Sequence, residues 1–193
     1  MKGAPNLDDQ GLVRIRRAAE TDAPAIADLH GRSFSATYPN LPKTMEATEN
    51  GSRQRVELWT NRLQNSLEDC AVFVAEDRGE IHGFVYAGPT TDTDDTPGST
   101  GQIFSIHVDP SAWGAGIGTK LLEFAVGHLR SMGVGDATLW VVDGNRRART
   151  FYESLGWKQD GAERNEILAI GTSNGDKVDV IRYRRQLRGG EDR

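Results

Sequence analysis

The sequence predicts a mixed α/β domain, in which a twisted sheet of about seven strands is flanked by about four helices. Three observations predict it. Short apolar or alternating segments recur along the chain, segments with helical apolar spacing lie between them, and glycines, prolines and polar runs separate the two kinds. Hairpins in the middle of the chain and strand–helix–strand units later indicate both antiparallel and parallel pairs in one sheet.

Composition and charge narrow the class of protein. The 193 residues are 37% hydrophobic and 26% charged, which is typical of a soluble domain, and no apolar run approaches the length of a membrane span. The only cysteine, Cys70, can form no intramolecular disulfide, and no spacing of Cys and His suggests a metal site. We therefore expect a cytoplasmic protein without a metal. The net charge of −5 argues against nucleic acid as the main partner, and we expect no membrane partner.

We expect a single domain over residues 11–187, preceded by a flexible lead at 1–10 and followed by a flexible tail at 188–193. In the first half, alternation predicts strands, and Thr21 and Asp22 can cap a helix with Pro24 in its first turn. A polar helix follows a break at YPNLP. The strands are expected at 12–18, 70–76, 80–88 and 101–110, and the second helix at 48–67.

The second half begins with a helix whose apolar positions run from Ile117 to Met132 and whose fitting C-terminal cap is Gly133. A short helix opens at Asn145 and is closed by Gly156. Strands are expected at 136–142, 163–170 and 177–186, with a TSNGDK turn between the last two.

Three glycines, Gly114, Gly116 and Gly118, lie where a strand gives way to a helix. The first N–H groups of a helix have no partner inside it, and the helix dipole makes that end positive. Glycines leave these N–H groups open to a bulky anion, so the segment suits a phosphate or pyrophosphate. The alternative is a turn with only a packing role. The spacing matches neither the dinucleotide fingerprint nor the P-loop.

The stretch VDPSAWGAGIGTKLL, from Val108 to Leu122, resembles the acetyl-coenzyme A (acetyl-CoA) loop of the GNAT acetyltransferase superfamily, although Ala112 and Trp113 depart from the commoner Gln-Gly or Arg-Gly start. The stretch from Leu139 to Trp157 is similar to a second motif of that family. The resemblance covers nearly the whole chain and implies a sheet that opens between the strands at 101–108 and 136–142, with the pantetheine arm in the gap. It implies these cofactor-binding residues: Ile106, His107, Val108, Trp113, Gly114, Ala115, Gly116, Ile117, Gly118, Thr119, Asn145, Arg146, Ala148, Arg149 and Tyr152.

Asn145 and Tyr152 are seven residues apart, which puts them on one face of a helix. The resemblance implies that the asparagine binds the cofactor and that the tyrosine hydroxyl protonates the leaving thiolate. The alternatives are a plain N-cap for Asn145 and a core aromatic for Tyr152. Arg146, Arg147 and Arg149 in the first turn oppose the helix dipole, so one or two of them are expected to reach the phosphates of the cofactor, with Arg146 or Arg149 preferred. The alternative is that the three form a solvated face.

The general base is left open by the sequence. Similar sequences often carry Glu where Gln102 stands, and an amide cannot take a proton at neutral pH. Gln102 could orient a water, or His107 could serve, although strand alternation places the two side chains on opposite faces. The base could instead come from Glu80 or from the acidic loop at 90–100.

The acceptor is expected to enter between the first helices and the hairpin, with Ser33, Phe34, Tyr38 and Trp59 as wall residues, although Phe34 and Trp59 could equally be core. Asp92, Asp94 and Asp95 could attract a cationic amine, or they could form a solvated loop.

The resemblance implies an N-acetyltransferase that moves an acetyl group from acetyl-CoA to a primary amine of a small molecule or peptide, by direct attack in a ternary complex. The alternative is a module that senses acyl-CoA with little turnover, which Gln102 favours and Tyr152 disfavours. Dimerisation is common for this fold, so a homodimer stays open.

Overall fold

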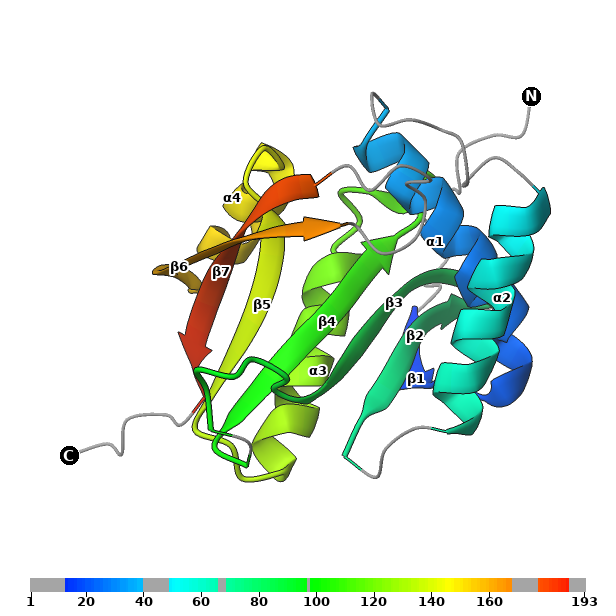
Figure 1. Cartoon of the computed structure of the whole chain (residues 1–193). Helices are drawn as coiled ribbons and strands as arrows, with labels where there is room; N and C mark the ends of the chain where they lie inside the picture. The colour runs from blue at the N-terminus through cyan, green and yellow to red at the C-terminus, as the bar shows by residue number, and fades with distance from the viewer. Residues whose placement is uncertain (1–12, 40–48, 66–68, 97, 168–176, 188–193) are drawn as a thin grey trace.

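The computed structural model describes residues 13–39, 49–65, 69–96, 98–167 and 177–187 (Figure 1). Within them, one seven-stranded sheet has the order β1-β2-β3-β4-β5-β7-β6. The elements are β1 (Arg14–Arg17), α1 (Ala23–Thr37), α2 (Glu49–Gln64), β2 (Ala71–Asp77), β3 (Glu80–Pro89), β4 (Thr100–Val108), α3 (Ile117–Ser131), β5 (Asp136–Val142), α4 (Arg146–Ser154), β6 (Lys158–Ile167) and β7 (Lys177–Gln186). The expected mixed sheet, with seven strands and four helices in this order, is confirmed.

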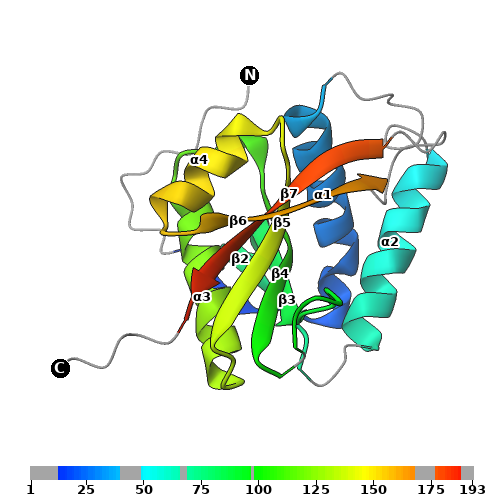
Figure 2. The same cartoon turned by 60° about the vertical axis from the view of Figure 1, so that its left-hand side comes forward.

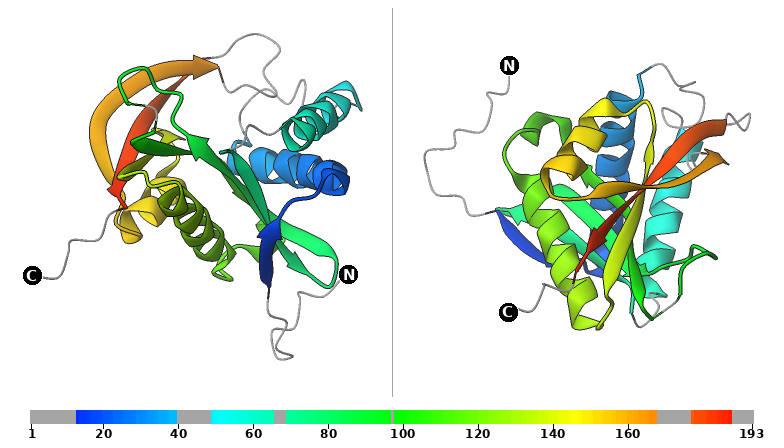
Figure 3. Two further views of the ribbon diagram at one scale, coloured as in Figure 1. Left: turned by 90° about the horizontal axis from the view of Figure 1, so that it is seen from below. Right: turned by 90° about the vertical axis from the view of Figure 1, so that its left-hand side faces the viewer.

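Helices cover both faces of the sheet (Figure 3). On one face, α3 and α4 bury a core that runs from Leu121 and Leu129 to Trp157. On the other face, α1 and α2 bury a second core around Ile26 and Trp59. Each helix therefore exposes a polar face and buries an apolar one, as its sequence spacing predicts.

The sheet opens between its two central strands. β4 and β5 run parallel, but they pair only from Thr100 opposite Asp136 to Ile103 opposite Leu139. Beyond that point they diverge, and Figure 1 shows the gap widening toward the carboxyl end of β4. On the far side, β5 pairs with β7, and β6 forms the edge of the sheet beyond it (Figure 2). The predicted opening between these strands agrees with this pairing.

A bulge in β4 changes which side chains share a face. Tyr86 of β3 lies opposite Ser105, but the next residue, Ala87, lies opposite Ile103, so β4 carries one extra residue. Gln102 and His107 lie opposite Gly88 and Phe84, positions that share one face of β3. The expectation that Gln102 and His107 face opposite sides was therefore wrong, because it assumed unbroken alternation.

Other local differences are small. β6 begins at Lys158 instead of residue 163. The strand continues through Asp160 and Gly161 because these residues form a β-bulge, in which Gly161 has φ +92°. Residues 168–170, most of the predicted TSNGDK turn and the predicted domain boundaries at 11 and 188 lie outside the described residues. Asp22 makes no capping bond to α1; its carboxylate accepts from the Ala19 N–H and pairs with Arg16. None of the described helices is both long and apolar enough to cross a membrane.

Candidate functional site

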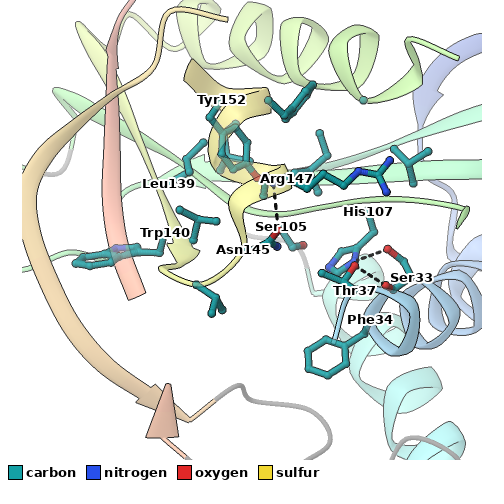
Figure 4. A pocket seen from close by; sticks show the side chains of 18 of the residues that line it. Ser33, Phe34, Thr37, Ser105, His107, Leu139, Trp140, Asn145, Arg147 and Tyr152 are labelled. Atoms are coloured by element: carbon teal, nitrogen blue, oxygen red, sulfur yellow. Dashed lines mark hydrogen bonds between the residues drawn. The ribbon is translucent and has the colours of Figure 1, made fainter. Parts of the chain in front are cut away.

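A cavity of about 730 Å³ lies where β4 and β5 diverge, and α1, α4 and the glycine segment complete its walls (Figure 4). The predicted residues that line it are Ser33, Phe34, Tyr38, Gln102, Ile106, His107, Val108, Trp113, Gly114, Gly116, Ile117, Gly118, Thr119, Asn145, Ala148 and Tyr152. The predicted residues Trp59, Ala115, Arg146 and Arg149 are not among the lining residues. Sequence reasoning missed other lining residues, among them Thr37, Arg62, Thr91, Phe104, Ser105, Arg164 and Glu166.

The glycine segment exposes a row of backbone donors at one end of this cavity. Gly114 and Gly116 have φ of +85° and +76°, a conformation that disfavours any side chain, and Gly116 is the N-cap of α3. The first intrahelical bond there runs from the Lys120 N–H to the Gly116 carbonyl, so the N–H groups of residues 117–119 have no partner within the helix. Gly118 has a different role, because a Cβ there would lie 3.3 Å from the ring of Phe151. The segment is thus suited to bind an anion.

The open edge of β4 offers a second set of backbone groups. The Asp109 N–H donates to the His82 carbonyl at 2.8 Å, which makes Val108 opposite Gly83 a non-hydrogen-bonded pair of the antiparallel ladder. In such a pair the N–H and C=O point away from the partner strand. By alternation, Ile106 and Val108 therefore turn their backbone groups toward the gap, whereas His107 bonds to β3. An extended amide-bearing ligand can pair with this edge as an added strand does.

Trp113 and Arg147 close the cavity between these two sets of donors. The Trp113 Nε1 donates to the Val108 carbonyl at 2.9 Å, and the Arg147 guanidinium lies 3.6 Å from the centre of the Trp113 ring. Arg149 instead pairs with Asp143 at 2.5 Å and reaches the Tyr183 hydroxyl. Among the three arginines at the start of α4, the geometry therefore favours Arg147, which the sequence ranked last, over Arg146 and Arg149.

Asn145 and Tyr152 bring α4 into the cavity (Figure 4). The Asn145 Oδ1 accepts from the Ala148 N–H at 3.1 Å, so it is an N-cap, and its Nδ2 donates to the Tyr38 hydroxyl at 3.2 Å. Tyr152 is 7% exposed, and burial, together with the nearby Tyr38, raises the pKa of its phenol. Tyr152 is therefore protonated near neutral pH, as a proton donor must be. Both readings of Asn145 remain compatible with this geometry.

Two histidines lie side by side on the face of the sheet that α1 covers. The rings of His30 and His107 are 4.4 Å apart, and the His107 Nδ1 lies 3.3 Å from the Ser33 Oγ at the cavity wall. The Trp59 Nε1 donates to the His30 Nδ1 at 3.2 Å, which leaves the proton of a neutral His30 on Nε2. Burial lowers the pKa of His107 to about 4 and that of His30 to about 2. Trp59 is fully buried behind His30, so the core alternative describes it.

Gln102 is buried and already engaged. Its Oε1 accepts from the Thr91 N–H at 2.9 Å and from the Thr91 hydroxyl at 3.2 Å, and so it fixes the start of the acidic loop at the cavity. Glu80 lies exposed at the β2–β3 turn and is not among the lining residues, so the structure does not bring it to the site.

The carboxylates of the acidic loop pair with arginines from β6 and β7. The Asp92 side chain is 2% exposed and pairs with Arg164 at 3.0 Å and Arg182 at 3.4 Å; it also accepts from the Trp140 Nε1. Asp94 pairs with Arg182 at 2.8 Å, and Asp95 pairs with Arg184 at 2.8 Å. Oxygens of these three carboxylates lie within 4.8 Å of one another. The expectation that Asp92, Asp94 and Asp95 attract a cationic amine is therefore not favoured, because each of the three is already paired with an arginine of the chain.

The comparisons with known proteins agree with this geometry. A model of the acetyltransferase (GNAT) family matches residues 25–157. The mycothiol acetyltransferase of Thermobispora bispora is 30% identical over 158 residues, which are 77% of this chain and 54% of that protein. The mycothiol acetyltransferase of Thermomonospora curvata is 31% identical over 136 residues, which are 70% of this chain and 40% of that protein. The chain thus spans about half the length of these relatives, or less.

Solved structures share the fold. The structure of yncA from Salmonella typhimurium with its cofactor acetyl-CoA has a TM-score of 0.64 and 21% identity, covering 91% of this chain and 94% of that one. The paia N-acetyltransferase of Thermoplasma acidophilum in complex with coenzyme A has a TM-score of 0.64 and 20% identity, covering 86% and 96%. At these identities the likeness supports the arrangement of strands and helices and not the acceptor.

Proposed function

Because the chain belongs to the acetyltransferase (GNAT) family, we propose that it transfers an acetyl group from acetyl-CoA to a primary amine by direct attack in a ternary complex. One observation carries the proposal. The anion-binding glycine segment, the open backbone edge of β4 and the buried phenol of Tyr152 meet in one cavity. Each supplies something that this reaction needs, and they come from three separate stretches of the chain.

The cofactor half of the cavity fits acetyl-CoA. The N–H groups of residues 117–119, together with those of Gly114 and Gly116, would bind its pyrophosphate. The Arg147 guanidinium adds positive charge beside them. The backbone groups of Ile106 would pair with the pantetheine amides, and the Val108 N–H would serve as donor to the thioester carbonyl oxygen, while the Val108 carbonyl accepts from the Trp113 Nε1. Bound there, acetyl-CoA supplies the activated acetyl group.

In the transfer, the acceptor nitrogen forms a bond to the acetyl carbon, and the bond from that carbon to sulfur breaks. The phenol of Tyr152 gives its proton to the leaving sulfur. Only the free-amine form can attack, so an ammonium acceptor first gives one proton to solvent. After the C–N bond forms, the nitrogen must lose a second proton and is then much more acidic, so a weak neutral base suffices. We assign this role to His107, acting through the Ser33 hydroxyl, which lies 3.3 Å from its Nδ1. Gln102 then holds the Thr91 turn and takes no proton.

The position of the chain's single cysteine favours direct attack over an acetylated cysteine intermediate. Cys70, the chain's one cysteine, is buried and is not among the residues that line the cavity, so it is badly placed to carry the acetyl group. A buried free thiol also suits a reducing cytoplasm. The relatives' name makes a mycothiol-type acceptor one candidate. The homodimer stays a prediction.

The test is to supply acetyl-CoA and a panel of primary amines and to follow free thiol and N-acetylated product together. The proposal predicts equal amounts of the two with at least one amine. The Gly116→Glu variant, whose carboxylate would occupy the anion site, should lose cofactor binding by calorimetry. Binding of acetyl-CoA to the wild type without product from any amine would favour the sensor instead.

A further inference from the structure

Arg62 is a charged side chain in the cavity wall that lacks a counterion. It lies in the last turn of α2, and its guanidinium packs against the rings of Trp59 at 4.9 Å and Tyr86 at 5.2 Å. Among the described residues, no carboxylate forms an ion pair with it. Burial lowers its pKa, and the group that acts against this is the Tyr86 phenol, not an acid.

Two aromatic contacts do not fully compensate such a group. Cation–π contacts stabilise a guanidinium, but they leave its N–H donors without acceptors in the ring plane. A partly buried guanidinium binds a planar carboxylate in two parallel hydrogen bonds, and this arrangement satisfies both charge and donors. The chain therefore keeps a cation in the wall whose natural complement is an anion from outside the protein.

The carboxylates on this side of the cavity are already engaged in ion pairs with arginines. Arg164 pairs with Asp92 and with Glu166, which is the carboxylate that lines the cavity here. A cationic acceptor would thus meet the uncompensated charge of Arg62 and no free carboxylate. This arrangement disfavours polyamines.

Arg62 also lies close to the place where transfer would occur. Tyr86, which its guanidinium covers, is opposite Ser105 in the β3–β4 ladder, at the bulge where β4 leaves β5. The Ser105 Oγ is buried and has no hydrogen-bond partner in the part of the chain that the structure describes, and the side chain lines the cavity. Neighbouring strands are about 4.8 Å apart, so Tyr86 links the Arg62 guanidinium to the part of the cavity that Ser105 lines.

We propose that the acceptor is a small amine that carries a carboxylate, as an amino acid does, and that Arg62 binds this carboxylate. The inference rests on the proposed acetyltransferase function and narrows its acceptor class. The Ser105 hydroxyl is placed to hydrogen-bond the acceptor between its two ends.

The experiment compares matched pairs that differ only in the anionic group. L-Methionine, L-phenylalanine, L-glutamate and γ-aminobutyrate are each tested against the corresponding primary amide, with spermidine as the cationic amine. The wild type should acetylate at least one acid with kcat/KM about 10- to 100-fold above its amide, the range expected of one charge-assisted pair. A preference for amides or for spermidine would overturn the proposal.

Variants at Arg62 tie the preference to this residue. Arg62→Gln should reduce kcat/KM for the acid by about 10- to 100-fold and leave that for the amide and the KM for acetyl-CoA nearly unchanged. Arg62→Lys, which keeps the charge, should recover part of the loss. Arg14→Gln, an equal change of charge on the exposed face of β1, should change neither. An equal loss for acid and amide in Arg62→Gln would show a structural role and refute the assignment.

Failure of the proposed function gives a different pattern. If no amine is acetylated, calorimetry with the coenzyme A complex still tests the anion site by comparing each acid with its amide. Acid-selective binding that is lost in Arg62→Gln would support the site without catalysis. Absence of that selectivity would refute it.

Discussion

The two halves of the cavity differ in whether backbone groups or side chains form them. The cofactor half consists mainly of backbone, namely the N–H groups at the start of α3 and the open edge of β4. The acceptor half consists of side chains from α1, α2, the acidic loop and β6, which include Ser33, Arg62 and Arg164. A backbone site needs few particular side chains and binds groups that any acyl-CoA carries, whereas a side-chain site changes its ligand with each substitution.

The two halves also differ in how they are held. The cofactor half depends on the left-handed backbone of Gly114 and Gly116. The acceptor half depends on ion pairs that tie the acidic loop to β6 and β7, with Asp92 buried at their centre. Substitutions in one half should therefore leave the other half working, and the predictions that follow test this separation.

The largest effect is expected at Tyr152, where the halves meet. Tyr152→Phe removes the proton donor to the leaving sulfur and should reduce kcat about 10²- to 10⁴-fold, with little change in acetyl-CoA affinity. Tyr183→Phe removes a buried phenol that bonds to Glu153 and does not line the cavity, so it should stay active. Equal activity of the two variants in the thiol assay would remove Tyr152 from the mechanism.

Asp92→Asn should affect only the acceptor half of the cavity. It removes the charge of a carboxylate that is 2% exposed. Because Arg164 keeps Glu166 and Arg182 keeps Asp94, Asp95 and Asp160, the expected cost is about 1 to 3 kcal/mol of unfolding free energy. Urea unfolding measures this, and acetyl-CoA affinity under native conditions should change little. Asp94→Asn, at a carboxylate that is 61% exposed, should lose much less stability. A similar loss of stability in both variants would contradict the conclusion that Asp92 is the buried centre of these ion pairs.

Gly116→Ala should affect the cofactor half alone. An alanine at φ +76° costs about 1 to 2 kcal/mol in stability and should weaken acetyl-CoA binding, while the preference among acceptors stays the same. Gly127→Ala, on the exposed face of α3, should instead stabilise the fold by up to about 1 kcal/mol. Calorimetry and thermal unfolding of the two variants should give opposite signs for stability.

The last prediction concerns pH, where the effect is small near neutral pH and grows as the pH falls. The pKa of His107 in the folded protein is about 4, below its ordinary value of 6.5, so unfolding takes up a proton between these values. Stability should be level above pH 6.5 and fall as the pH drops toward 4, by up to about 1.4 kcal/mol per pH unit for each such histidine. His107→Gln should flatten this slope relative to wild type. An unchanged slope would mean that His107 is not buried in neutral form.

The contrast between the halves also explains what the sequence could predict. Gly114, Gly116, Asn145 and Tyr152 stand in contiguous motifs, and local rules for helix starts and caps place them correctly. Local rules failed where a single extra residue, or a partner distant in sequence, determines where a side chain lies. A single extra residue in β4 put Gln102 and His107 on one face, and no pattern in the strand announces it.

Long-range pairing was equally invisible. The acids at 92–95 were expected to be free because the arginines of β7 lie about 90 residues away in sequence, as in the Arg182–Asp92 pair. Arg62 lies in a polar helix, where an arginine is ordinary, and only the packing of α2 on Tyr86 brings it to the cavity. The sequence ranked Arg146 and Arg149 above Arg147, because helical spacing alone does not show which of these three arginines of α4 reaches the cavity.

The central claim, that both substrates meet in one cavity and react directly, is tested by initial velocities over a grid of acetyl-CoA and acceptor concentrations. Double-reciprocal lines that intersect are predicted, because both substrates must be bound before transfer. Parallel lines, together with acetylated protein trapped when the acceptor is omitted, would contradict the account, since they require a covalent acetyl-enzyme.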